Sequence, residues 1–146
     1  MKQKEIVLSV VFAFSVLNGL AQTEIFSTEA GAIQGYDPVA FFKESKPVIG
    51  KKEFTYSWNG ASWYFSIQEN LEAFKADPER YAPQYGGWCA YGTAEGHKSP
   101  TQPETWTIVD NKLYFNYNLE VKKLWTKNQK GLIEQANRNW PKLKLK

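Results

Sequence analysis

The stretch Phe54–Phe65 reads FTYSWNGASWYF and sets much of the fold expected for this chain of 146 residues. Aromatic residues alternate with small polar ones up to Trp58, which is the pattern of a half-buried strand. Asn59-Gly60 follows and is the strongest short hairpin signal, because both central positions of a type I′ turn need a positive φ. Ala61–Phe65 then returns as a second strand, so the sequence predicts a β-hairpin here.

A helix is expected directly after this hairpin. Ser66 and Glu69 have the spacing of a capping box, in which two side chains bond free backbone amides at the helix start. Ile67, Leu71 and Phe74 follow at four- and three-residue steps, which gives the helix one apolar face. The Asp-Pro pair that comes next should end the helix.

The C-terminal part of the chain repeats this mixture of strands and helices. Trp106–Val109 and Lys112–Phe115 flank Asp110-Asn111 and predict a second hairpin. Asn118 can cap a following helix, and Lys127–Gly131 should break it. Apolar positions on one side of that helix and of a final short helix, closed by Pro141, are Val121, Leu124, Trp125, Leu132, Ile133, Ala136 and Trp140. The expected fold is therefore α+β, with two hairpins forming an antiparallel sheet packed by about three helices.

The N-terminal part of the chain falls into a leader and a lead-in. Lys2 and Lys4 precede an apolar run, and Gly19 and Ala21 supply the small residues before a cut, which is the layout of a secretory signal peptide over residues 1–21. An uncleaved anchor or a buried helix is the alternative. Thr23–Ile33 is then a polar lead-in, mobile or paired at a sheet edge.

A domain of residues 22–146, exported to the periplasm or secreted, is thus expected, with no stable membrane insertion once the leader is gone. Losing Lys2, Lys4 and Glu5 lowers the net charge from +3 to +2, and the charges form no dominant block. That is weak support for nucleic-acid binding, which needs a basic stripe. The basic tail Pro141–Lys146 reads as a frayed, solvated end.

The chain has one cysteine, Cys89, and one histidine, His97. A lone cysteine in an exported chain is a buried thiol, a reactive thiol, a metal ligand or half of an intermolecular bridge. The eight-residue spacing around Gly92 and Gly96 allows a loop to bring the two side chains together. Cys89 and His97 are therefore the candidate metal ligands.

A metal site on this pair would be short of ligands. A structural zinc ion takes four, so Asp37, Glu95 or Glu104 would have to complete the shell. Copper(I), or another soft transition metal, is better suited because a thiolate is a soft ligand that can hold it with few partners. The same pair could make a thiolate nucleophile, but no third orienting group is identified, and no catalytic residue is assigned.

The aromatic residues around the glycines near Cys89 offer a second kind of site. They can line a pocket or an interface, or they can be core residues. The candidate ligand-pocket residues are Tyr85, Trp88, Tyr91 and Asp37.

The chain resembles the YHS-domain family, in its exported, stand-alone subgroup, over nearly all of the mature sequence. The matching residues are Tyr36–Val39, Gly60, Tyr64–Ser66, Phe74, Asp77–Tyr81, Tyr85–Gly92, Trp106, Asp110, Leu113-Tyr114, Asn116–Asn118 and Trp140-Pro141. YHS units occur beside copper-transporting ATPases and in some phenol hydroxylases, so the resemblance implies metal binding, with copper the first metal to consider. Family members often carry cysteines where this chain has Ala40, Ser66 and Asn70.

The sequence therefore favours a small exported YHS-like protein without enzymatic activity that binds a metal ion or small ligand near Cys89. The first alternative is a thiol-based redox or catalytic protein that uses Cys89 and His97. The second is a structural or partner-docking domain, for which the sequence names no protein partner.

Overall fold

The computed structural model describes residues 24–146. The expected signal peptide lies outside the described residues. Within the described part of the chain, no helix is long and apolar enough to cross a membrane.

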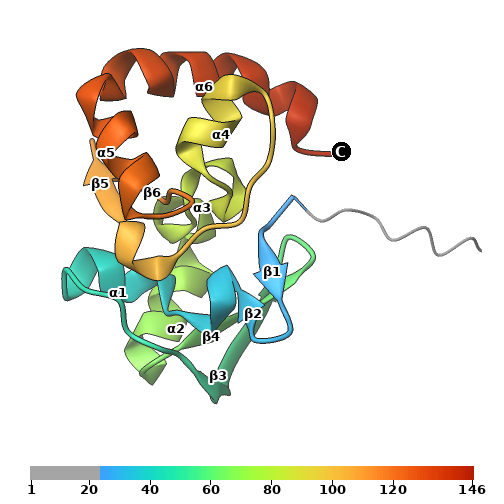
Figure 1. Cartoon of the computed structure of the whole chain (residues 1–146). Coiled ribbons are helices and arrows are strands. Elements are labelled where there is room, and N and C mark those ends of the chain that lie inside the picture. The colour runs from blue at the N-terminus through green and yellow to red at the C-terminus, as the bar shows by residue number, and fades with distance from the viewer. Residues whose placement is uncertain (1–23) are drawn as a thin grey trace, which may run out of the picture.

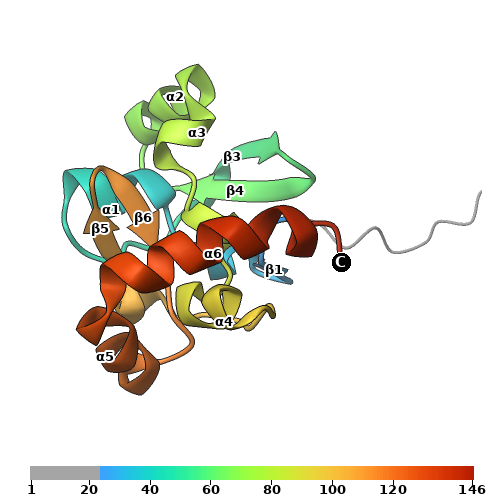
Figure 2. The same ribbon diagram turned by 90° about the horizontal axis from the view of Figure 1, so that it is seen from above.

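The elements form two halves, which Figure 1 draws one above the other, except that the short helix Pro78–Tyr81 lies near their boundary; Figure 2 shows them from above. The first half contains β1 (Ser27–Thr28), β2 (Gly31–Ala32), a 3-10 turn (Ile33–Gly35), α1 (Pro38–Lys43), β3 (Lys51–Trp58), β4 (Ala61–Phe65), α2 (Gln68–Ala76) and α3 (Pro78–Tyr81). The second contains 3-10 turns at Gln84–Gly87 and Pro103–Thr105, α4 (Ala90–Glu95), β5 (Thr107–Val109), β6 (Lys112–Tyr114), α5 (Leu119–Lys127) and α6 (Gln129–Leu143).

The α+β class predicted from the sequence is confirmed. Over residues 24–146 the strands form three separate two-stranded antiparallel sheets, β1–β2, β3–β4 and β5–β6, so the two predicted hairpins do not join into one sheet. Within the lead-in expected from the sequence, β1 and β2 pair with each other as a small antiparallel sheet. That segment is anchored by Ile25 and Phe26, which are buried.

The β3–β4 hairpin has the predicted turn. Asn59 and Gly60 have φ values of 51° and 75°, the positive angles that a type I′ turn requires. Alternation along β4 buries Trp63 and Phe65 completely. These side chains pack on Phe74 of α2, with ring centroids 5.1 and 5.2 Å away, and this aromatic group forms the middle of the first core.

The β5–β6 hairpin lies between two hydrophobic cores. Leu113 and Phe115 belong to the first core, whereas Tyr114, between them in sequence, belongs to the second. Successive side chains of a strand point to opposite faces, so β6 contributes to both cores. The second core is completed by Trp125 of α5 and Ala136 of α6, both fully buried.

The predicted capping box at the start of α2 is wrong. The helix begins one residue after Ile67, which makes no side-chain cap bond and is 47% exposed. Ser66 instead donates its backbone N–H and its hydroxyl to Asp37, both at 2.8 Å. A buried carboxylate is the stronger acceptor for a nearby hydroxyl, so the cap is lost. Leu71 and Phe74 are buried as predicted.

The end of the chain also differs from the prediction. The break after α5 is confined to Asn128, and Pro141 lies inside α6, which continues to Leu143 instead of closing there. The Lys98 ammonium donates hydrogen bonds to the backbone oxygens of Lys144 and Lys146, at 3.1 and 2.9 Å. These bonds and the buried Leu143 hold the C-terminal turn in place, so the expected frayed tail is docked.

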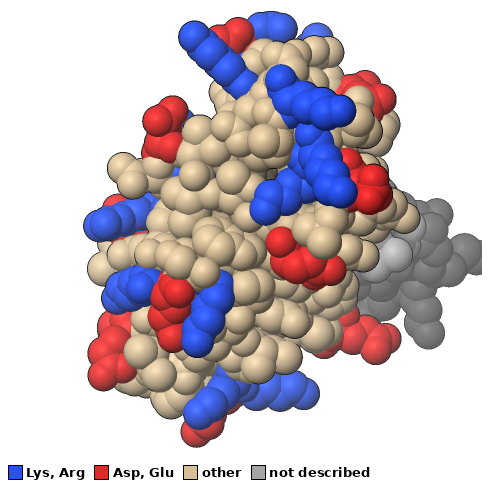
Figure 3. Space-filling model, turned by 60° about the vertical axis from the view of Figure 1, so that its left-hand side comes forward, with Lys and Arg blue, Asp and Glu red and all other residues tan. Residues whose placement is uncertain are grey.

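Charged residues of both signs are interspersed on the face drawn in Figure 3, between areas of uncharged surface.

Candidate functional site

Cys89 lies at the N-terminus of α4, in the interior of the second half. Its exposed fraction is 1%, and its sulfur accepts hydrogen bonds from the backbone amides of Gly92 and Tyr117 at 3.4 and 3.3 Å. The thiol can donate to Asn116 Oδ1, 3.6 Å away. Burial raises the pKa of the Cys89 thiol, although those backbone amides oppose the shift. The arrangement therefore holds a protonated, packed thiol.

The side chain of His97 lies beside α4, the helix that Cys89 caps. A Cβ atom placed on Gly92 would lie 3.0 Å from the His97 ring, so the loop does bring the histidine beside this helix. The ring is exposed, however, and its Nδ1 lies 3.3 Å from the Ser99 hydroxyl. Within residues 24–146 there is no group of three or more His, Cys, Asp or Glu side chains that could hold a metal ion. Neither Glu95 nor Glu104 completes a shell around the pair.

Asp37 is fully buried and lies at the N-terminus of α1. Its Oδ1 accepts from the amides of Val39 and Ala40, at 2.9 and 3.2 Å. Its Oδ2 accepts from Ser66 N, Ser66 Oγ and Asn70 Nδ2, each at 2.8 Å. Asp37 thus joins the starts of two helices through five hydrogen bonds.

This Asp37 cluster coincides with the three positions at which family members often carry cysteines. Ala40, Ser66 and Asn70 all donate to the same carboxylate. Its two oxygens are saturated by amide and hydroxyl donors, and soft metals prefer thiolates. The residues at these positions therefore do not fit the metal that the resemblance implies.

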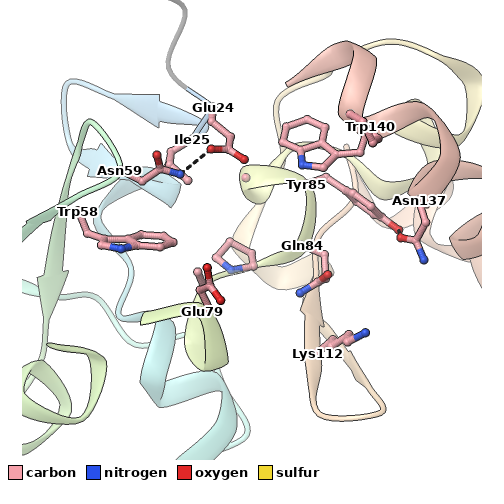
Figure 4. A pocket seen from close by; sticks show the side chains of 14 residues that line it. Glu24, Ile25, Trp58, Asn59, Glu79, Gln84, Tyr85, Lys112, Asn137 and Trp140 are labelled. Carbon is pink, nitrogen blue, oxygen red and sulfur yellow. Dashed lines mark hydrogen bonds between the residues drawn. The ribbon is translucent and has the colours of Figure 1, made fainter. Parts of the chain in front are cut away.

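A groove of about 440 Å³ lies between the two halves of the molecule. Aromatic rings, carboxylates and amides line it from both sides, as Figure 4 shows. The lining residues are Glu24, Ile25, Trp58, Asn59, Glu79, Ala82, Pro83, Gln84, Tyr85, Gly86, Lys112, Asn137, Trp140 and Pro141.

Tyr85 and Gly86 line this groove on the side of Trp140. Tyr85 has a φ of 57°, which is rare for a residue with a side chain. Its hydroxyl donates to Asn137 Oδ1 at 2.8 Å, and its ring lies 6.1 Å from that of Trp140. Burial raises the pKa of the Tyr85 hydroxyl, so the group stays a neutral donor.

The N-terminal segment forms the rim. A Cβ atom on Gly86 would lie 2.0 Å from the carbonyl oxygen of Glu24, so only glycine permits this close approach. The same oxygen accepts from Trp88 Nε1 at 3.1 Å, and Phe26 N donates to Gly86 O at 2.8 Å. The Glu24 carboxylate accepts from Asn59 Nδ2 at 2.7 Å, which fixes it at the turn of the β3–β4 hairpin.

The predicted pocket residues are distributed over different places. Tyr85 lines the groove, whereas Asp37 is buried in the cluster described above. Trp88 packs on Phe26 and on the Lys98 ammonium, and Tyr91 packs against the second core. The structure therefore brings one of the four into the groove.

The residues that sequence reasoning missed are Glu24, Trp58, Glu79 and Trp140. Both tryptophans fit the apolar faces of regular elements and were assigned to packing. They do pack, but each is only partly buried and has surface left for the groove. The sequence signal that could have indicated them is the position of each tryptophan near the end of its element, Trp58 in β3 and Trp140 in α6.

Comparison with known proteins finds a family match over part of the chain. Residues 39–85 match the family model of the YHS domain. Searches of the curated proteins and of the solved structures found no significant match to the chain. Seven of the 14 groove residues fall inside the matched range and seven outside it, so the groove combines this domain with the remainder of the chain.

Proposed function

Because the chain carries a YHS domain at residues 39–85, we propose that it is an exported, non-enzymatic binding protein whose ligand occupies the groove between that domain and the C-terminal half. Tyr85, expected from the sequence to line a pocket near Cys89, is one of the lining residues of this groove. The ligand is a small molecule, since the groove has a volume of about 440 Å³.

The observation that carries the proposal is how the groove is built. Its walls come from the hairpin turn, the N-terminal segment and α6, three segments far apart in the sequence. Partly apolar walls with a few placed polar groups are typical of small-molecule sites. Tyr85 keeps an unusual backbone conformation there, and such conformations concentrate at functional sites.

A metal site on Cys89 and His97 is less favoured by the geometry. Both acceptor positions of the sulfur are taken by backbone amides, and the thiol has an oxygen partner within reach. Binding copper(I) would have to break these contacts and move an exposed ring inward. The same burial argues against a catalytic thiol, because the thiolate is the reactive form and burial raises the pKa of Cys89.

The test is to close the groove. Gln84 lines it and is partly exposed, so Gln84→Trp should fill the space without disturbing a core. Gln135→Trp, on the exposed surface of α6 and outside the groove lining, is the matched control.

Ligand-observed NMR with a mixture of small cationic, neutral and anionic compounds provides the measurement. We expect at least one compound to bind the wild-type protein and the Gln135→Trp variant, and to lose binding in Gln84→Trp. Binding that survives Gln84→Trp, or no binding by any compound, contradicts the proposal. A parallel titration with copper(I) checks the metal alternative, for which the ultraviolet absorption of a copper–thiolate bond, absent from Cys89→Ser, would be the sign.

A further inference from the structure

We infer that the groove is selective for a small organic cation, an amine or a quaternary ammonium compound. The inference rests on the proposed function, since it names the class of ligand for the same groove. It follows from the aromatic side chains and carboxylates that line the groove, and from the ammonium of Lys98, which lies over the ring of Trp140.

Three aromatic side chains line the groove: Trp58, Tyr85 and Trp140. Figure 4 shows Trp58 on one side of the space, with Trp140 and Tyr85 on the other. The face of an aromatic ring carries negative potential and attracts a cation, most strongly for the indole of tryptophan. Trp58 and Trp140 thus place two indoles in the lining of one groove.

The carboxylates lie between these walls. In Figure 4, Glu24 lies at one end of the space between the tryptophans and Glu79 at the other, whereas Lys112 lies beyond Gln84. The lining thus has two negative groups and one positive group, in a chain whose net charge is +3. The charges of this lining therefore favour a cation in the groove over an anion.

Glu24 is prepared for this role by its neighbours. Asn59 Nδ2 donates to one carboxylate oxygen and holds the side chain at the rim. Its backbone carbonyl is held by Trp88 Nε1 at 3.1 Å. A pre-positioned carboxylate loses little conformational freedom on binding, which favours affinity.

The protein already uses one of these rings to hold a cation. The ammonium of Lys98 lies 5.7 Å from the centroid of Trp140 and 5.5 Å from that of Trp88. It also donates to two backbone oxygens of the C-terminal turn, so the Lys98 site combines two indoles with oxygen acceptors. The groove also has indoles and oxygen acceptors in one lining, with Trp58 and Trp140 as the indoles and the carboxylates of Glu24 and Glu79 as the acceptors.

The test compares a cation with its neutral shape analogue. Choline and 3,3-dimethylbutan-1-ol have the same shape and differ in the charge at the branched centre. In calorimetric titrations we expect choline to bind at least about tenfold more tightly than the alcohol, the difference that a partly desolvated cation–π site produces. A titration with 1,4-diaminobutane shows whether primary amines are taken as well.

Variants assign the selectivity to the groove. Glu24→Gln combined with Glu79→Gln keeps the shapes and removes both charges, so the preference for choline over the alcohol should fall at least about threefold. Glu53→Gln, on the exposed surface of β3 and outside the groove lining, should leave it unchanged. An unchanged preference in the double variant overturns the inference.

The outcomes separate this inference from the proposed function. If neutral or anionic compounds bind and are displaced by Gln84→Trp while both cations fail, the groove is a ligand site but not a cation site. If the alcohol binds as tightly as choline, shape alone decides and the inference is again overturned. If no compound of any charge is affected by Gln84→Trp, both proposals fail.

Discussion

Removing the carboxylate of Asp37 should cost more stability than removing any exposed acid. Asp37→Ala leaves the amides of Val39 and Ala40 without their cap, which by itself costs about 1 kcal/mol. It also leaves three donors on Ser66 and Asn70 without an acceptor, and each buried donor left unpaired costs about 1–3 kcal/mol. Because these losses are not additive and Ser66 is only partly buried, we expect a loss of about 4 kcal/mol in the free energy of unfolding.

Asp37→Asn should be milder, for a reason that the structure provides. The amide keeps one oxygen for the cap of α1. Asn70 Oδ1 is buried without a hydrogen-bond partner, so the Asn70 amide can turn and accept from the new Nδ2 group. Only the backbone N–H of Ser66 then faces another donor, the new Nδ2 group. We therefore expect a loss of about 2 kcal/mol in the free energy of unfolding.

The measurement is urea unfolding followed by tryptophan fluorescence and by far-UV circular dichroism. Glu44→Ala, an exposed acid just after α1, is the matched control and should change the free energy of unfolding by less than about 0.5 kcal/mol. A loss below about 1 kcal/mol for Asp37→Ala, or equal losses for the two Asp37 variants, would refute the reasoning about the cluster.

Three further outcomes can be checked on the same protein. Asn59→Pro should cost about 2 kcal/mol or more, because proline cannot adopt the φ of 51° at this turn; an unchanged melting temperature would count against the hairpin. Cys89 should react slowly with a thiol reagent until urea unfolds the chain, and Cys89→Ser should cost about 1–3 kcal/mol by burying a hydroxyl. Folding raises the pKa of Tyr85, so stability should fall as the pH rises above about 10, and less steeply in Tyr85→Phe; parallel urea midpoints from pH 8 to 11 would exclude this.

Local signals in the sequence were sufficient for much of the fold. The Asn59-Gly60 turn and the alternation around it predicted β3 and β4, and Asn118 caps α5 through Val121 N at 2.9 Å as expected. These features depend on neighbouring residues only, so propensity and periodicity capture them. The length of α6 was missed because the bonds from Lys98 to its C-terminal turn join residues far apart in the sequence.

The candidate site was harder to predict for the same reason. The predictions centred on the one cysteine and the one histidine, because rare residue types draw chemical hypotheses. Cys89 proves to be packed inside, and the groove is assembled by Glu24, Trp58, Glu79 and Trp140, which come from four separate segments. No spacing rule links such residues, so only the tertiary structure brings them together.

The indole N–H signals of the six tryptophans provide the most direct test of the groove as the ligand site. The protein is labelled with ¹⁵N, the signals are assigned with Trp→Phe variants, and choline is added. We expect the signals of Trp58 and Trp140 to shift with one common dissociation constant, while those of Trp106 and Trp125, which pack in the two cores, stay in place. Saturable shifts that leave out both Trp58 and Trp140, or no shifts at all, would contradict binding of an organic cation in this groove.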